Sequence, residues 1–276
     1  MRGSARFLAA LGLAAAVSGA PAAHADAGAA PAGCAGSPAA GGERTVRVGD
    51  AERRAVVRLP AGYDGREALP VVIAFHGFTA NARSMELVTD FSRAWPEAIV
   101  VYAQGLHRQI RRVGKERGPG WQLVPGELGD RDLAFFDALR AMLFERYCID
   151  EKRLYLVGAS NGAFFTHVLG CSRPHAIAGI ASSMGGFACM PPTPVPVLLS
   201  HGRTDGLVRF RTALRAAREW ANRNGCAARR GDLPDGCTDY QGCGTPLVFC
   251  AHGGGHVVDP AFPEQAASFF RRLEKR

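Results

Sequence analysis

A serine near the middle of the chain lies in the sequence GASNG at residues 158–162, directly after an apolar, β-rich run at residues 153–157. A strand, a sharp turn and a following helix would force the Ser160 side chain out at the end of a sheet. The two glycines would keep neighbouring side chains from blocking it. Because G-x-S-x-G also occurs by chance in glycine-rich chains, the strand and the helical stretch at residues 163–169 carry the inference. The pattern predicts Ser160 as a nucleophile.

A serine hydroxyl is a weak nucleophile until an imidazole accepts its proton. The chain has eight histidines, and we predict that His256 is the base because it lies in a glycine-rich loop after a strand at residues 247–250. His252, at the end of that strand, is the competing candidate. His201 and His76 are each followed by glycine at a strand end, and we expect them to shape their loops.

The imidazole needs a carboxylate that fixes its tautomer and stabilises its charged form. Asp205 follows a predicted strand at residues 195–199, and we assign it this role, with an Asx turn as the alternative. The other candidates lie in a cysteine-rich segment and are interpreted as turn residues: Asp232, Asp235 and Asp239. The resulting chain order is Ser, Asp, His, the order found in α/β-hydrolases.

Acyl transfer also requires hydrogen-bond donors for the oxyanion of the tetrahedral intermediate. In this fold one donor is the backbone N–H after the serine, which here belongs to Asn161. The other comes from the loop after the strand that ends at Phe75, and we predict the N–H of Phe78. The sequence does not decide which N–H of residues 76–79 is used.

Alternating strands and helices must position these residues. Strands are expected at residues 45–48, 53–59, 71–75, 99–102, 153–157, 177–181, 195–199 and 247–250, and helices at 84–94, 133–146, 163–169, 212–222 and 263–273. Asp132 is expected to cap the second of these helices. The alternation predicts an α/β fold with a mostly parallel central sheet, helices on both faces and no separate lid domain.

The first residues have the features of an export signal. A positive start is followed by an apolar run at residues 7–17 and by an A-x-A site that ends at Ala25. We therefore expect residues 1–25 to be a cleaved signal peptide, 26–43 a flexible Ala/Gly/Pro-rich lead-in and 44–276 one catalytic domain of a secreted protein. Acylation of Cys34 is a less favoured alternative. The apolar run is too short for stable membrane insertion.

Eight cysteines, an even number, follow the predicted cleavage site. In an exported protein they indicate disulfides, whose pairing the sequence leaves open. No C-x-x-C spacing or His/Cys cluster predicts a metal site, and we expect no metal or organic cofactor.

Basic residues exceed acidic ones, with a formal net charge of +8 for the whole chain. The densest basic run, at residues 108–117, lacks interleaved aromatic residues and is expected to be an exposed loop; the alternative is a cleft rim that attracts anionic substrate. We expect no nucleic-acid partner.

Several spaced motifs give the chain a resemblance to a known family. They are AFHG at residues 74–77, YCID at 147–150, GASNG at 158–162, NGC at 224–226, GC at 242–243, FC at 249–250 and GGH at 254–256. With them the chain, from about Arg44 to its C-terminus, resembles secreted α/β-hydrolase esterases of the feruloyl esterase and polyhydroxybutyrate depolymerase type. The resemblance implies Ser160, Asp205 and His256 as a catalytic triad.

Two positions depart from that family. Ala163 replaces a glycine, and residues 257–260 replace the Thr-Trp that follows the histidine in many depolymerase-like members. We therefore favour feruloyl or acetyl esters of plant polysaccharide over a polyester. Trp121 is expected either to stack on an aromatic acyl group or sugar at the cleft mouth or to pack in the core. A monomeric serine esterase is the leading hypothesis; the alternatives are a peptidase and a non-catalytic carbohydrate-binding protein.

Overall fold

The structure is a computed structural model that describes residues 32–34, 39–110, 114, 117–187, 189–190, 192–227, 230–233 and 236–273. The expected signal peptide, residues 1–25, lies outside the described residues, as do most of the lead-in and Asp235.

A ten-stranded sheet forms the centre of the described chain, in the order β1-β2-β4-β3-β7-β8-β9-β12-β11-β10. Six neighbouring strands, from β4 to β12, run parallel, and antiparallel strands extend both edges. The bounds are β1 (Gly42–Val48), β2 (Ala51–Arg58), β3 (Leu69–Phe75), β4 (Ile99–Ala103), β7 (Ile149–Ala159), β8 (Gly179–Ser183), β9 (Val197–Gly202), β10 (Arg230–Asp232), β11 (Cys237–Tyr240) and β12 (Leu247–His252). A separate antiparallel pair consists of β5 (Leu106–Gln109) and β6 (Arg117–Gly120).

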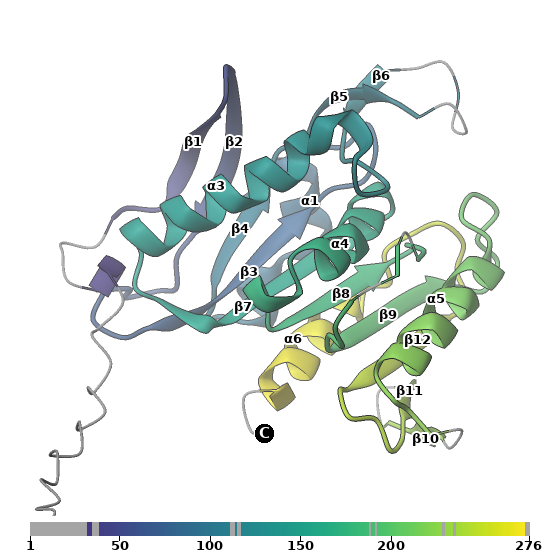
Figure 1. The fold of residues 1–276 in the computed structure, drawn as a ribbon. Helices are drawn as coiled ribbons and strands as arrows, with labels where there is room; N and C mark the ends of the chain where they lie inside the picture. Colours follow the sequence, from purple (N-terminus) through teal and green to yellow (C-terminus); the bar gives the residue numbers. More distant parts are fainter. Residues whose placement is uncertain are drawn as a thin grey trace, which may run out of the picture.

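Helices cover both faces of this sheet, as the sequence predicted. They are α1 (Ala82–Thr89), α2 (Phe91–Ala94), α3 (Arg131–Arg146), α4 (Asn161–Ser172), α5 (Phe210–Arg223) and α6 (Phe262–Leu273). Short 3-10 turns lie at η1 (Ala32–Cys34), η2 (Glu127–Asp130) and η3 (Pro174–Ala176). Helices α3, α4 and α5 pack on one face, which is turned toward the viewer in Figure 1, and α1, α2 and α6 pack on the other.

The central strands are apolar along their whole length because each face of the sheet has its own core. In β3, Val71, Ile73 and Phe75 belong to the cluster under α3, α4 and α5, whereas Val72 and Ala74 belong to the cluster on the opposite face. Successive side chains of a strand point to opposite faces, so a strand covered on both sides needs an apolar residue at every position. The continuous apolar run therefore correctly identified a central strand.

Asp132 does not cap a helix, which corrects the expectation from the sequence. Helix α3 begins at Arg131, and its N-cap residue, Asp130, makes no side-chain cap hydrogen bond. Asp132 is fully buried, and its Oδ1 accepts a hydrogen bond from Arg53 at 2.9 Å while its Oδ2 accepts one from the N–H of Gln122 at 2.9 Å. Asp132 therefore compensates the charge of Arg53, a buried side chain on β2.

Four disulfides pair all eight cysteines: Cys34–Cys148, Cys171–Cys189, Cys226–Cys243 and Cys237–Cys250. The prediction of disulfides is confirmed, and the structure supplies the pairing that the sequence left open. The sulfur of Cys34 is used in a disulfide, so the alternative of a lipid-modified Cys34 does not fit this structure.

The basic run at residues 108–117 is not simply an exposed loop. Arg108 is buried, and its guanidinium donates to Glu127 at 2.5 Å and 3.2 Å and to the carbonyl of Trp121 at 2.5 Å. Arg117, in β6, is exposed, and residues 111–113 and 115–116 lie outside the described part of the chain.

Among the described residues, no helix is long and apolar enough to cross a membrane. Within the same part of the chain, no three His, Cys, Asp or Glu side chains are grouped so that they could hold a metal ion.

The buried ion pair between β2 and α3 leads to a stability prediction. Replacing Arg53 by methionine removes the charge partner that is hydrogen-bonded to the buried Asp132 carboxylate and leaves only Arg131 at 3.9 Å, and this should lower the free energy of unfolding by about 3–5 kcal/mol. The measurement is urea denaturation at neutral pH. The matched control is Arg54→Met on the same strand, whose side chain is 62% exposed and pairs with an equally exposed Glu43; its effect should stay below about 0.5 kcal/mol. Equal effects of the two substitutions would contradict the prediction.

Candidate active site

Ser160 lies at the sharp turn between β7 and α4, with φ 51° and ψ −115°. Its N–H donates to the carbonyl of Ser183 on β8 at 2.8 Å, which fixes the turn against the neighbouring strand. A Cβ on Gly158 would run into the carbonyl of Gly162, and one on Gly162 would run into the carbonyls of Phe75 and His76. The two motif glycines therefore allow a close approach of backbone to backbone, whereas the sequence analysis had explained them by free access to the serine side chain.

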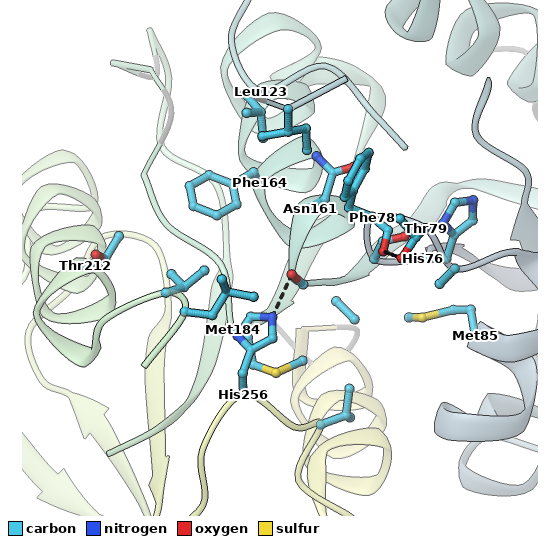
Figure 2. A pocket seen from close by; sticks show the side chains of 18 of the residues that line it. His76, Phe78, Thr79, Met85, Leu123, Asn161, Phe164, Met184, Thr212 and His256 are labelled. Carbon is cyan, nitrogen blue, oxygen red and sulfur yellow. Dashed lines mark hydrogen bonds between the residues drawn. The ribbon is translucent and has the colours of Figure 1, made fainter. Parts of the chain in front are cut away.

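The structure brings Ser160, His256 and Asp205 into one hydrogen-bonded line. The Nε2 of His256 lies 2.8 Å from the Oγ of Ser160, and its Nδ1 lies 2.8 Å from the Oδ2 of Asp205 (Figure 2 shows the Ser160–His256 contact). The ring is positioned by the loop that follows β12, and Asp205 by the loop that follows β9. With Nδ1 protonated toward Asp205, Nε2 is free to accept the serine proton.

Asp205 uses its two oxygens for different purposes. Oδ1 accepts hydrogen bonds from the N–H groups of Leu207 at 2.9 Å and Val208 at 2.8 Å, so the Asx-like turn exists alongside the contact to His256. Burial acts to raise the pKa of Asp205, but the hydrogen bonds from His256 and these two N–H groups outweigh it and hold the pKa below its usual range. The carboxylate is therefore charged when the imidazole needs it.

A second histidine also contacts this carboxylate. The Nε2 of His201 lies 2.7 Å from the carbonyl of Val208 and 3.3 Å from the Oδ2 of Asp205. The side chain is buried, and desolvation lowers the pKa of His201 despite the nearby carboxylate. His201 thus shapes the 205–208 loop, as expected, and the contact to Asp205 adds to that role.

The other histidine and the described aspartates considered as triad members hydrogen-bond to residues outside the Ser160–His256–Asp205 line. The Nδ1 of His252 accepts a hydrogen bond from the N–H of Gly254 at 3.2 Å and lies 3.9 Å from Asp259. Asp232 is in β10, and Asp239, in β11, accepts a hydrogen bond from Gln241 at 3.0 Å.

The loop after β3 presents backbone N–H groups beside Ser160. The N–H of Thr79 is already used, because it donates to the carbonyl of Pro119 at 2.9 Å. Among the described residues, the N–H of Phe78 donates no hydrogen bond, and that of Asn161 is in the unpaired first turn of α4. The N–H groups of Phe78 and Asn161, the pair predicted from the sequence, are thus without an acceptor in the described chain, and so is the N–H of Gly77 in the same loop.

His76 holds that loop in place through both ring nitrogens. Nδ1 donates to the carbonyl of Gly77 at 2.7 Å, and Nε2 accepts from the N–H of Gly105 at 2.9 Å. Burial lowers the pKa of His76 to about 4, although the hydrogen bond to Gly77 opposes the shift. The ring is therefore neutral near pH 7, as its acceptor role requires, and the expected loop-shaping role is confirmed.

Trp121 does not lie at the cleft mouth, so the expectation that it stacks on substrate is wrong. Its side chain is 0% exposed, and its Nε1 donates to the carbonyl of His76 at 2.9 Å. The side chain of Asn161 accepts from the N–H of Trp121 at 2.7 Å and donates to its carbonyl at 2.9 Å. Trp121 therefore supports the site from behind, and this role of the Asn161 side chain was not found from the sequence.

A cleft of about 1460 Å³ opens over Ser160. Apolar side chains such as Phe164 and Leu123 make up much of its lining, and Figure 2 shows Met85 on the far side of the cleft from Thr212. Helix α5 and the residue before it contribute three arginines, which the sequence analysis had not singled out: Arg209, Arg211 and Arg215.

No family model matches the chain. A search of curated proteins finds Probable feruloyl esterase C of Aspergillus clavatus, 30% identical over 218 residues, which cover 75% of this chain and 77% of that protein. Feruloyl esterase B of Piromyces equi is 26% identical over 235 residues, covering 74% of this chain but only 42% of that longer protein.

Solved structures share the fold. The acetyl xylan esterase from Aspergillus awamori aligns with a TM-score of 0.66 at 15% identity, covering 84% of this chain and 99% of that one. A CE1 ferulic acid esterase from Anaeromyces mucronatus, solved in complex with ferulic acid, aligns with a TM-score of 0.57 at 18% identity, covering 85% and 89% of the two chains.

Buried neutral histidines around the site lead to a prediction about acid stability. His167 of α4 is fully buried and accepts a hydrogen bond from Trp220 at 2.9 Å, and burial lowers its pKa to about 3. His76 and His167 both resist protonation in the folded state. The unfolded chain therefore binds more protons below its histidine pKa, and stability falls as the pH drops from about 6.5 toward the folded pKa. Each histidine should cost about 2 kcal/mol of unfolding free energy at pH 5 relative to pH 7.5.

The measurement is urea denaturation of the wild type and of His167→Gln at several pH values between 7.5 and 5. The variant should lose roughly half of the pH dependence that these two histidines contribute. His175→Gln, which removes an exposed ring, is the matched control and should follow the wild-type slope. Parallel curves for wild type and His167→Gln would contradict the prediction.

Proposed function

Because the chain belongs to the family of feruloyl esterases, which are carboxylic ester hydrolases, we propose that it is a serine esterase that cleaves feruloyl or acetyl esters of plant polysaccharide. The observation that carries the serine mechanism is the unbroken line from Ser160 through His256 to Asp205, with 2.8 Å at each contact. The names of the relatives and of the structural neighbours support these two acyl groups.

The geometry supports a two-step reaction. Ser160 Oγ attacks the ester carbonyl carbon while His256 Nε2 takes the hydroxyl proton, and the N–H groups of Phe78 and Asn161 hold the resulting oxyanion. Collapse of the intermediate breaks the bond to the alcohol, which leaves with the proton from His256, and the acyl group remains on Ser160. Water then attacks the acyl-enzyme by the same route and releases the acid.

The form of the cleft supports a large substrate. At about 1460 Å³ the cleft exceeds the roughly 300–1,000 Å³ of ordinary small-molecule pockets. Apolar side chains such as Met85 and Val88 of α1 offer an environment for an aromatic acyl group, and the rest of the cleft leaves room for sugar units.

Secretion is part of the proposal. Four disulfides involving every cysteine suit an oxidising compartment, and they agree with the export signal expected at residues 1–25. We further propose that the enzyme acts as a monomer. It needs no metal or organic cofactor in this proposal, because the triad supplies the nucleophile, the base and the charge stabilisation from its own side chains.

The nucleophile can be tested directly. Ser160→Ala should lower kcat on methyl ferulate and p-nitrophenyl acetate by about six orders of magnitude, because the acyl-enzyme cannot form. Ser172→Ala, at the far end of α4, is the matched control and should keep wild-type rates. A panel of feruloyl, acetyl and 3-hydroxybutyrate esters then ranks the acyl groups. Wild-type rates in Ser160→Ala would refute the mechanism, and a best rate on the 3-hydroxybutyrate ester would refute the substrate class.

The role of the carboxylate predicts a different signature. Asp205→Asn keeps an oxygen for the N–H groups of Leu207 and Val208 but presents an amide donor to His256, which favours the wrong tautomer. We expect kcat to fall about 10⁴-fold with little change in stability. Asp239→Asn tests the competing carboxylate and should stay within twofold of the wild type. A larger loss in Asp239→Asn than in Asp205→Asn would overturn the assignment.

A further inference from the structure

One side of the cleft carries a group of cationic side chains that the ester chemistry does not use. Arg209 precedes α5, and Arg211 and Arg215 lie on its first turns, where they line the cleft together with Thr212 of the same helix. The opposite face of the helix carries its buried residues and packs against the sheet. Arg211 and Arg215 line the cleft because they lie on the side of α5 that faces away from the sheet.

Within the described part of the chain, these three arginines form no ion pair. The carboxylate that lines the same cleft, Glu127, is already held by Arg108 at 2.5 Å. Arg211 and Arg215 are four residues apart, a spacing at which like charges destabilise a helix, and they lie toward its positive end. Their placement therefore weakens the helix and leaves positive charge uncompensated beside the cleft.

The opposite end of the cleft has a different character. There α1 contributes Met85 and Val88, both apolar, to the lining. Figure 2 shows Met85 on one side of His256 and Thr212, on the arginine-bearing helix, on the other. The reacting serine thus lies between an apolar arm and a cationic arm.

We propose that Arg209, Arg211 and Arg215 form a carboxylate-binding subsite for the alcohol side of the ester, so that the preferred substrates are esters of acidic, uronate-bearing polysaccharides. The inference rests on the proposed ester hydrolysis. Feruloyl and acetyl groups carry no negative charge, so their place is the apolar arm, and the cationic arm is left for the glycan. Guanidinium groups bind carboxylates through paired hydrogen bonds, and a glycan with uronate units next to the acylated sugar presents such groups.

The test compares two feruloylated oligosaccharides of equal length, one neutral and one that carries uronate units. For the wild type at low ionic strength, kcat/KM should favour the uronate ester by about tenfold, the effect expected when two or three partly exposed charge pairs form. Salt at 0.5 M should move this ratio toward one, because it screens exposed charges. Arg211→Gln combined with Arg215→Gln should lower the ratio about tenfold, and Glu at both positions should bring it below one.

The matched control removes two arginines of the same helix that do not line the cleft, Arg218→Gln with Arg223→Gln, and should keep the wild-type ratio. An unchanged ratio in the cleft variant, or no preference in the wild type, would overturn the proposal. A preference for 4-nitrophenyl hemisuccinate over 4-nitrophenyl butyrate without one for uronate would overturn it too, because the charge would then belong to the acyl side.

If the proposed ester hydrolysis itself is wrong, the wild type will cleave neither oligosaccharide, and this outcome differs from a missing preference for uronate. Calorimetric titration with unesterified oligogalacturonate decides the subsite in that case, and also if the cleft variant does not fold. Salt-sensitive binding by the wild type supports the subsite, and absence of binding overturns it.

Discussion

The close approach of the β7–α4 turn to the end of β3 is the constraint on which the site depends. Gly162 lies so near the carbonyls of Phe75 and His76 that no side chain fits there, and this contact brings Ser160 and the loop that carries the Phe78 N–H together. Ser160 has a positive φ that costs roughly 1–3 kcal/mol, and the surrounding sheet has to hold it in place. Its N–H bond to Ser183 and the packing of α4 on the sheet provide that support.

Buried polar residues around this turn hold His256 and the neighbouring loops in position through hydrogen bonds. Asp205 organises its own loop with one oxygen and orients His256 with the other, while His201 contacts both that loop and the carboxylate. The ring of His76 and the side chain of Asn161 fix the backbone on the oxyanion side. Because Asp205, His201, His76 and Asn161 are buried, losing one of their hydrogen bonds would leave a polar atom away from water, and this cost favours the observed arrangement.

Disulfides stabilise the segments next to the loop that carries His256 and at the end of α4. Cys237–Cys250 ties β11 to β12 shortly before His256, and Cys226–Cys243 closes the preceding loop region. Cys171–Cys189 anchors the end of α4. Closing loops of this length stabilises the fold by about 3 kcal/mol each in a chain-entropy model.

The sequence by itself determined the sheet, the candidates for the triad and the loop that offers oxyanion donors, but not which N–H of that loop is used. The buried faces of strands, the strand ends and the glycines of the turn can be recognised from the local sequence. Parallel strands then place their carboxyl ends at one edge of the sheet. Only the tertiary structure decided the roles of Trp121, Asp132 and Arg108 and the pairing of the cysteines. Arg53 and Asp132 are 79 residues apart, and the partner of a buried polar group depends on which segments meet in space. Local periodicity records which side of an element is buried, but it does not record what lies against that side.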